Sequence, residues 1–195
     1  MDEKLRSLNI FVRGDSKDAL SIRNFILLVW GIILAGFQIS LPKRVARRIY
    51  EEAKRLGMSS DEYLVELITQ SLDPKNRARE YIETAKELLE EAYNELRKKD
   101  IRQAAEKLWG AVALAVKAYA YWRENKRLAS HGELWKYVDK LISELGEWIS
   151  DAWNAGQSMH VCFYEGWCTE KHVELALKRI ERLVEEIASR IYAKA

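Results

Sequence analysis

The sequence predicts an all-α protein, in which an antiparallel helical bundle follows a short strand–helix–helix element. Only two prolines and nine glycines occur among 195 residues, so the chain offers few breaks to long helices. Apolar residues recur at three- and four-residue spacing through most of residues 43–192. Serine, threonine or aspartate, which favour helix N-termini, precede most of these periodic segments.

The composition is that of a chain that forms a hydrophobic core. It is 48% hydrophobic and 32% charged, which is not typical of a disordered chain. The net charge of +2 is too small to indicate nucleic-acid binding by itself. Binding to nucleic acid would therefore require a local cluster of basic residues.

Residues 1–36 form an N-terminal extension without a clear helical or strand pattern before residue 25. Residues 25–37 are an unbroken apolar run of 13 residues. A bilayer span needs about 20, so we do not expect membrane anchoring by this run. Three interpretations stay open: a buried segment that caps the bundle, a short membrane anchor, or a start codon placed upstream of the true one.

The pattern of residues 37–72 predicts one strand and two helices. Apolar and polar residues alternate over residues 37–41, which is typical of a short strand. A helix follows over residues 43–56 and ends at Gly57, and Ser59 with Glu62 forms a capping box that opens the second helix. So small a unit cannot bury a core alone, so we expect it to dimerise or to dock. The first helix carries a basic face of Lys43, Arg44, Arg47, Arg48, Lys54 and Arg55.

Residues 73–195 predict the bundle. Asp73 and Pro74 open a long helix that runs to about residue 98, and Asp100 caps the next helix. Residues 108–122 are apolar nearly all round, which is typical of a central helix. Ser130 and Glu133 repeat the capping-box pattern, and two further helices are expected over residues 148–164 and after Thr169.

Cys162 and Cys168 are expected to be free, buried thiols of a cytoplasmic protein. Their spacing matches neither a CxxC motif nor a paired Cys/His zinc motif. We therefore predict no metal site and no cofactor.

The candidates for chemistry are a lysine and two of the three histidines. Lys117 interrupts an apolar run, where a charge requires a partner, such as Glu133 or Glu165. His160 lies among aromatic residues in HVCFYEGW, and His131 follows a helix cap. Imidazole, phenol and carboxylate groups together can bind a polar ligand or transfer protons. Our hypothesis is a polar interhelical pocket built from Lys117, His131, Glu133, His160, Tyr164 and Glu165, with no catalytic residue assigned.

Residues 37–72 resemble ribbon-helix-helix proteins of the antitoxin and repressor type. The resemblance lies in the apolar–polar alternation, the Leu-Pro step, the basic helix, the glycine and the serine-capped helix. It implies that Gln38 and Ser40 face the DNA groove and that the amides near Ser59 and Ser60 hold a phosphate.

Residues 73–192 resemble the archaeal PaREP paralogous-repeat proteins. The segments that carry this resemblance are LDPKNRAREYIETAKELLEEA, RQAAEKLWGAVALAVKAYAY, SHGELWKYV and HVCFYEGW. That family is similar to the helical HEPN superfamily, which implies a HEPN-like bundle. In HEPN RNases four to six residues lie between the arginine and the histidine, whereas here three residues lie between Arg127 and His131 and seven between Arg123 and His131. We therefore do not expect the RNase activity to carry over.

The function expected from the sequence is that of a non-enzymatic interaction protein or a nucleic-acid-associated regulator, similar to toxin–antitoxin components. It would be a homodimer through residues 37–72, with nucleic acid or another protein as its partner. The alternatives are a divergent HEPN-type RNase that uses His131 or His160, and a helical bundle that binds a nucleotide or similar anion at Lys117.

Overall fold

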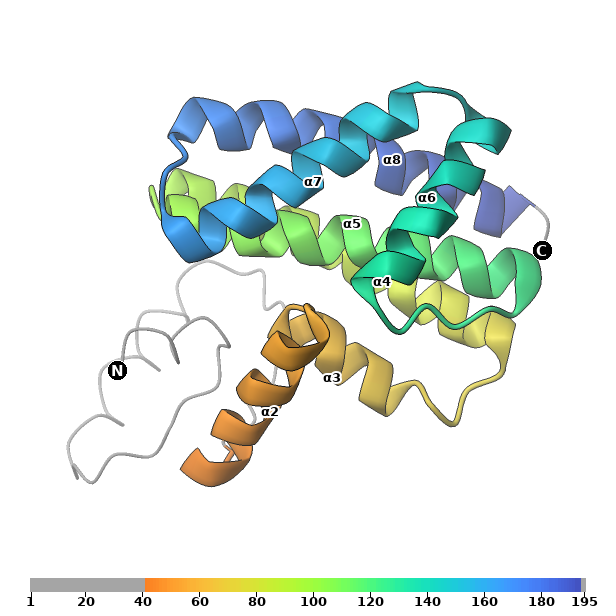
Figure 1. The fold of residues 1–195 in the computed structure, drawn as a ribbon, viewed down its shortest axis with the longest axis horizontal. Coiled ribbons are helices and arrows are strands. Elements are labelled where there is room, and N and C mark those ends of the chain that lie inside the picture. The colour runs from red at the N-terminus through yellow and green to blue at the C-terminus, as the bar shows by residue number, and fades with distance from the viewer. Residues whose placement is uncertain (1–40, 194–195) are drawn as a thin grey trace, which may run out of the picture. The chain divides into compact units, whose positions relative to one another are not determined.

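The computed structural model describes residues 41–193, and these residues form seven helices without a strand. The predicted all-helical bundle is confirmed. The strand predicted for residues 37–41 lies outside the described residues except for Leu41, as do residues 1–36. In chain order the helices are α2 (Lys43–Leu56), α3 (Ser60–Ile68), α4 (Pro74–Arg97), α5 (Ile101–Glu124), α6 (His131–Leu145), α7 (Trp148–Glu165) and α8 (Glu170–Ala193) (Figure 1).

The chain divides into two compact units, residues 1–50 and residues 51–195. Helix α2 contains the boundary between them. It ends at Gly57, whose φ of +69° lies in the left-handed region, as expected for a glycine after a helix. Ser59 then caps α3 with the predicted capping box.

Helix α5 is the central helix of the bundle, as the apolar run predicted. Every residue from 104 to 121 is buried. Helices α4, α6, α7 and α8 all contact α5, and α7 crosses it in Figure 1. Close contact on several sides is possible because seven of these residues are alanines. At Gly156 of α7, a Cβ would lie only 2.4 Å from Val112 of α5.

The remaining helices have the predicted starts. Asp73, Asp100 and Ser130 cap α4, α5 and α6 with their side chains. Each cap satisfies backbone N–H groups that have no partner within the helix. None of the helices described is long and apolar enough to cross a membrane.

The two cysteines form a disulfide bond, so the expectation of free thiols is wrong. Cys162 lies in the last turn of α7, and its Cα is 5.6 Å from that of Cys168. The chain reverses at Gly166, which has a φ of +71°. This left-handed residue brings Cys168 back beside the end of the helix that it follows, within the range that a disulfide bridges.

Candidate functional site

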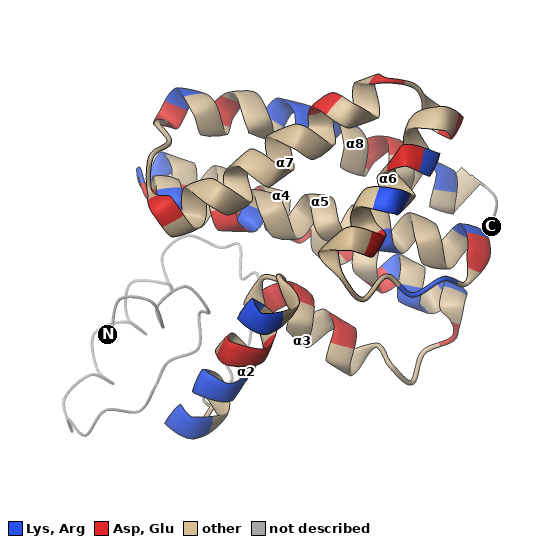
Figure 2. Cartoon of the chain, in the orientation of Figure 1, with Lys and Arg blue, Asp and Glu red and all other residues tan. Residues whose placement is uncertain are grey.

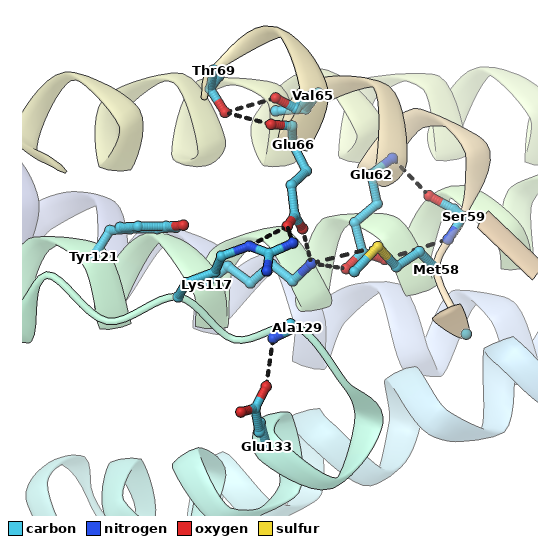
Figure 3. Close-up of polar contacts among 12 residues, drawn as sticks. Met58, Ser59, Glu62, Val65, Glu66, Thr69, Lys117, Tyr121, Ala129 and Glu133 are labelled. Carbon is cyan, nitrogen blue, oxygen red and sulfur yellow. Dashed lines mark hydrogen bonds and ion pairs between the residues drawn. The ribbon is translucent and has the colours of Figure 1, made fainter. Parts of the chain in front are cut away.

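A buried cluster of charges joins α3 to α5. The Nζ atom of Lys117 lies 2.8 Å from Oε1 of Glu62 and 3.0 Å from Oε2 of Glu66. Figure 3 shows the lysine of α5 between these two carboxylates of α3. Its side chain is 1% exposed. The partners of Lys117 are therefore Glu62 and Glu66, and not Glu133 or Glu165 as expected.

Arg127, in the segment after α5, completes this cluster. Its Nε atom donates to Oε1 of Glu66 at 2.7 Å, and its Nη2 atom also contacts that oxygen. Burial raises the pKa of Glu66, but Lys117 and Arg127 outweigh it and hold the pKa below its ordinary value. Burial lowers the pKa of Lys117, and the two carboxylates outweigh this effect in turn. Glu66 and Lys117 are therefore both ionised at neutral pH.

A second buried lysine of α5 also faces α3. The Nζ atom of Lys107 lies 2.5 Å from Asp61 of α3 and 2.7 Å from Glu91 of α4. Beside it, Glu106 is buried, and its Oε2 atom has no hydrogen-bonding partner among the described residues. Burial, helped by the charge of Asp61 and opposed by Lys107, raises the pKa of Glu106 to about 8.

Two histidines lie side by side on Trp109 of α5. The ring centroids of His131 and His160 are 5.2 Å apart, and they lie 5.1 and 4.7 Å from the Trp109 ring. Both imidazoles are partly exposed. The rings of His160 and Tyr164 form a T-shaped pair, with their centroids 5.2 Å apart. The fold thus forms an imidazole pair between α6 and α7.

Hydrogen bonding and burial determine the protonation of this pair. Nε2 of His131 lies 2.6 Å from the carbonyl oxygen of Gly57. A carbonyl only accepts, so Nε2 carries a proton and Nδ1 holds the lone pair in the neutral ring. Burial and then the neighbouring His131 lower the pKa of His160 to about 4. His160 is therefore neutral at physiological pH.

The structure brings together three members of the predicted pocket: His131, His160 and Tyr164. Lys117 lies in the charge cluster instead. The segment that contains Gly57 and Met58 contacts both groups: the carbonyl of Gly57 binds His131, and Sδ of Met58 is 3.8 Å from Nζ of Lys117. The other two predicted members are exposed: Glu133 accepts a hydrogen bond from the amide of Ala129 at 2.6 Å, and Glu165 ends α7.

The site also contains residues that were not predicted as members of the pocket: Trp109, Asp61, Glu62, Glu66, Glu91, Glu106, Lys107 and Arg127. The even apolar pattern of α5 concealed Trp109, and the capping-box role expected of Glu62 concealed its pairing with Lys117. In the part of the chain from 41 to 193, no three His, Cys, Asp or Glu side chains are grouped to hold a metal ion.

Helix α2 carries the basic residues that the sequence singled out. Its fourteen residues include six Lys or Arg and two Glu. Figure 2 shows these charges along the helix. All six basic residues are exposed: Lys43, Arg44, Arg47, Arg48, Lys54 and Arg55.

The two serines of the predicted phosphate contact are buried, and the amide of Ser59 donates to the Glu62 carboxylate at 3.3 Å. Ser60 is 5% exposed. Gln38 and Ser40, the predicted groove contacts, lie outside the described residues.

A family model for the archaeal PaREP1/PaREP8 family matches residues 80–184, which is more than half of the chain. The chain belongs to the archaeal PaREP1/PaREP8 family. No curated protein and no solved structure matches it significantly.

The PaREP1/PaREP8 match covers the basic residues of the charge cluster but not its acidic residues in α3. Lys107, Lys117, Arg127 and both members of the histidine pair lie within residues 80–184. Helix α3, which supplies Asp61, Glu62 and Glu66, precedes the matched region. The basic side chains thus belong to the PaREP1/PaREP8 region, and the carboxylates of α3 that neutralise them come from outside it.

Proposed function

We propose that this PaREP1/PaREP8 protein is a non-enzymatic, nucleic-acid-associated regulator that contacts phosphates through α2. The observation that supports this is the concentration of basic residues on one short helix. The fourteen residues of α2 include six exposed Lys or Arg side chains and only two Glu, in a chain whose net charge is +2. Phosphate contacts by Lys and Arg supply most of the sequence-independent affinity for nucleic acid.

The proposal includes a ribbon-helix-helix-like dimer formed through residues 37–72. In the chain this element is followed by a HEPN-like bundle, as in toxin–antitoxin components. Exposed apolar side chains on α3 support an interface in this element: Leu67 is 41% exposed and Ile68 is 72% exposed. Sedimentation of the full chain over a range of concentrations tests the dimer. A monomer throughout would contradict it.

The triple substitution of Lys43, Arg44 and Arg47 by Gln is expected to weaken binding to labelled duplex DNA. The slope of log affinity against log salt should become shallower by about 2 to 3, since each lost phosphate contact removes almost one unit. Fluorescence anisotropy between low and moderate salt measures both effects. The matched control replaces exposed Lys75, Lys171 and Lys178 by Gln. Equal losses in the two triple variants, or no binding by the wild type at low salt, would contradict the proposal.

The imidazole pair supports a second candidate, a divergent HEPN-type RNase. Two adjacent, partly exposed imidazoles can act on an RNA phosphodiester. Neutral His160 would take the proton of the attacking 2′-hydroxyl, and His131, in its form protonated at Nδ1 as well as Nε2, would give the Nδ1 proton to the leaving 5′-oxygen. The attack forms a 2′,3′-cyclic phosphate as the bond to the 5′-oxygen breaks.

RNA cleavage by the wild type is expected to fall by roughly a hundredfold or more in His131→Ala and in His160→Ala. The control is His172→Ala, because His172 lies at the start of α8, where its Nδ1 atom accepts from the amide of Thr169. Gel analysis of structured and single-stranded RNA gives the rates. Equal survival of RNA with the wild type and all three variants would exclude this candidate.

A further inference from the structure

We propose that α3 covers a cationic surface, formed by α5 and the segment that follows it, and that this surface binds a single-stranded RNA backbone when α3 is released. The carboxylates of α3 occupy the positions that phosphates take in the bound state. This site is separate from the basic face of α2, and it lies next to the imidazole pair.

One short segment contacts four basic side chains of the bundle. Residues 57–66 supply Asp61 to Lys107, Glu62 and Glu66 to Lys117, Glu66 to Arg127, and the Gly57 carbonyl to His131. The lysines are ten residues apart on α5, which is about 15 Å along the helix axis. The segment thus lies on the bundle as a short run of negative charge on a row of positive charge.

Release of this segment would expose the Nζ atom of Lys117. Within residues 41–193, the polar contacts of that nitrogen all come from the segment: Sδ of Met58, Oε1 of Glu62 and Oε2 of Glu66. The burial of the lysine charge therefore depends on α3. Release would remove the α3 carboxylates from Lys117 and Arg127, whereas Lys107 would lose Asp61 and keep Glu91 of α4. The resulting row of basic side chains would attract a phosphodiester backbone, which carries one negative charge per nucleotide.

Helix α3 has little apolar contact to hold it in place. It contains nine residues, of which Val65 alone belongs to the hydrophobic core of the described structure. A helix of this length is not stable by itself in water. Its position therefore depends on the ion pairs, and a competing polyanion can replace these.

The two ends of α3 are held differently. At its C-terminal end, Arg77 of α4 donates to the carbonyl oxygens of Thr69 at 2.8 Å and Gln70 at 2.5 Å. At the other end, Gly57 fits tightly against the ring of His131, where a Cβ would lie 2.6 Å from Cδ2. Opening would thus start at Gly57 and pivot near Thr69.

The test combines Asp61→Asn, Glu62→Gln and Glu66→Gln in a protein that already carries the three Gln substitutions in α2. Binding of a labelled 12-nucleotide oligouridylate is measured by anisotropy at low salt. Affinity should rise at least about tenfold over the α2 variant alone, since three competing carboxylates lose their charge. The control replaces exposed Glu90, Glu174 and Glu185 by Gln, which changes the net charge equally.

Adding Lys107→Gln to the protein with the three α3 substitutions, called the α3 variant, should abolish the rise in oligouridylate affinity. No gain in the α3 variant, or the same gain in the control, would overturn the inference. Because the compared proteins carry the same three Gln substitutions in α2, the difference in affinity between them does not depend on whether α2 binds nucleic acid. The readout is binding rather than cleavage, so it is also independent of the RNase candidate.

A second substitution keeps all the carboxylates of α3. It provides a test that still applies if the variant with three α3 substitutions does not fold. Gly57→Ala would push a Cβ into His131, whereas Gly166→Ala imposes the same left-handed strain with 3.8 Å to the nearest atom. Oligouridylate affinity should rise severalfold in Gly57→Ala and stay unchanged in Gly166→Ala. Equal affinities in a folded Gly57→Ala protein would contradict release from the Gly57 end.

Discussion

Replacing Lys117 by Met is expected to weaken the attachment of α3 to α5 by about 3 to 5 kcal/mol, because the change leaves two buried carboxylates without their buried cation. The side chains of Glu62 and Glu66 are 0% and 7% exposed, so water cannot take the place of the lysine in the closed state. Amide hydrogen exchange of residues 60–68 should accelerate by about two to four orders of magnitude, while the amides of α5 stay protected.

The size of this effect should depend on pH. Glu66 has a pKa below its ordinary value, so its ion pairs stabilise the fold above about pH 4.5 and lose that contribution as the pH falls through the folded pKa. In Lys117→Met the carboxylate of Glu66 loses its main stabilising cation and can protonate instead, so the difference from the wild type should shrink at pH 4. Arg127→Met is the comparison, since that side chain is 58% exposed and its loss should cost about 1 kcal/mol. Unchanged exchange of α3 in Lys117→Met would show that the cluster does not hold this helix.

Replacing Glu106 by Gln is expected to raise the free energy of unfolding by about 2 to 4 kcal/mol at pH 8, with little effect at pH 4. The pKa of Glu106 is about 8 in the folded protein against an ordinary value of 4.5. Folding therefore favours the protonated carboxyl. The wild type loses this stability as the pH rises from 4.5 through 8, whereas Gln does not titrate.

Urea unfolding at several pH values measures this difference. Glu90→Gln is the control, because Glu90 is exposed on the neighbouring helix α4. The curves of wild type and Glu106→Gln should diverge steadily between pH 5 and pH 8 and then run parallel. A constant difference across this range would mean that Glu106 does not titrate as its burial requires.

Local signals in the sequence predicted the helices well. Ser59, Asp73, Asp100 and Ser130 cap the helices that they were expected to open. The central position of α5 followed from an apolar pattern without a polar face. These features depend on residues close together in the chain, so a single sequence contains the information.

The partners of Lys117 depend on contacts between distant residues and could not be predicted in the same way. The sequence indicated that this lysine requires a carboxylate, but Glu66 lies 51 residues away from it in the chain. Glu62 was assigned to the capping box, and it does fill that role with Oε2 while Oε1 pairs with Lys117. The sequence shows only the capping role of Glu62, because that role depends on neighbouring residues, whereas the pairing with Lys117 does not.

The histidine pair and the cysteine pair illustrate the same limit. His131 and His160 were each candidates, but their contact depends on how α6 and α7 pack around Trp109. The cysteines matched no known spacing, and their bond depends on the left-handed turn at Gly166.

That disulfide gives the turn between α7 and α8 a second covalent path. A protease that cuts any peptide bond between Cys162 and Cys168 opens a ring and does not divide the chain, because the sulfur bridge still links both sides. The exposed residues of this turn include Trp167, which is 48% exposed. A nick there would separate the last helix from the rest of the protein only after reduction, so α8 stays attached to the bundle wherever the bridge is intact.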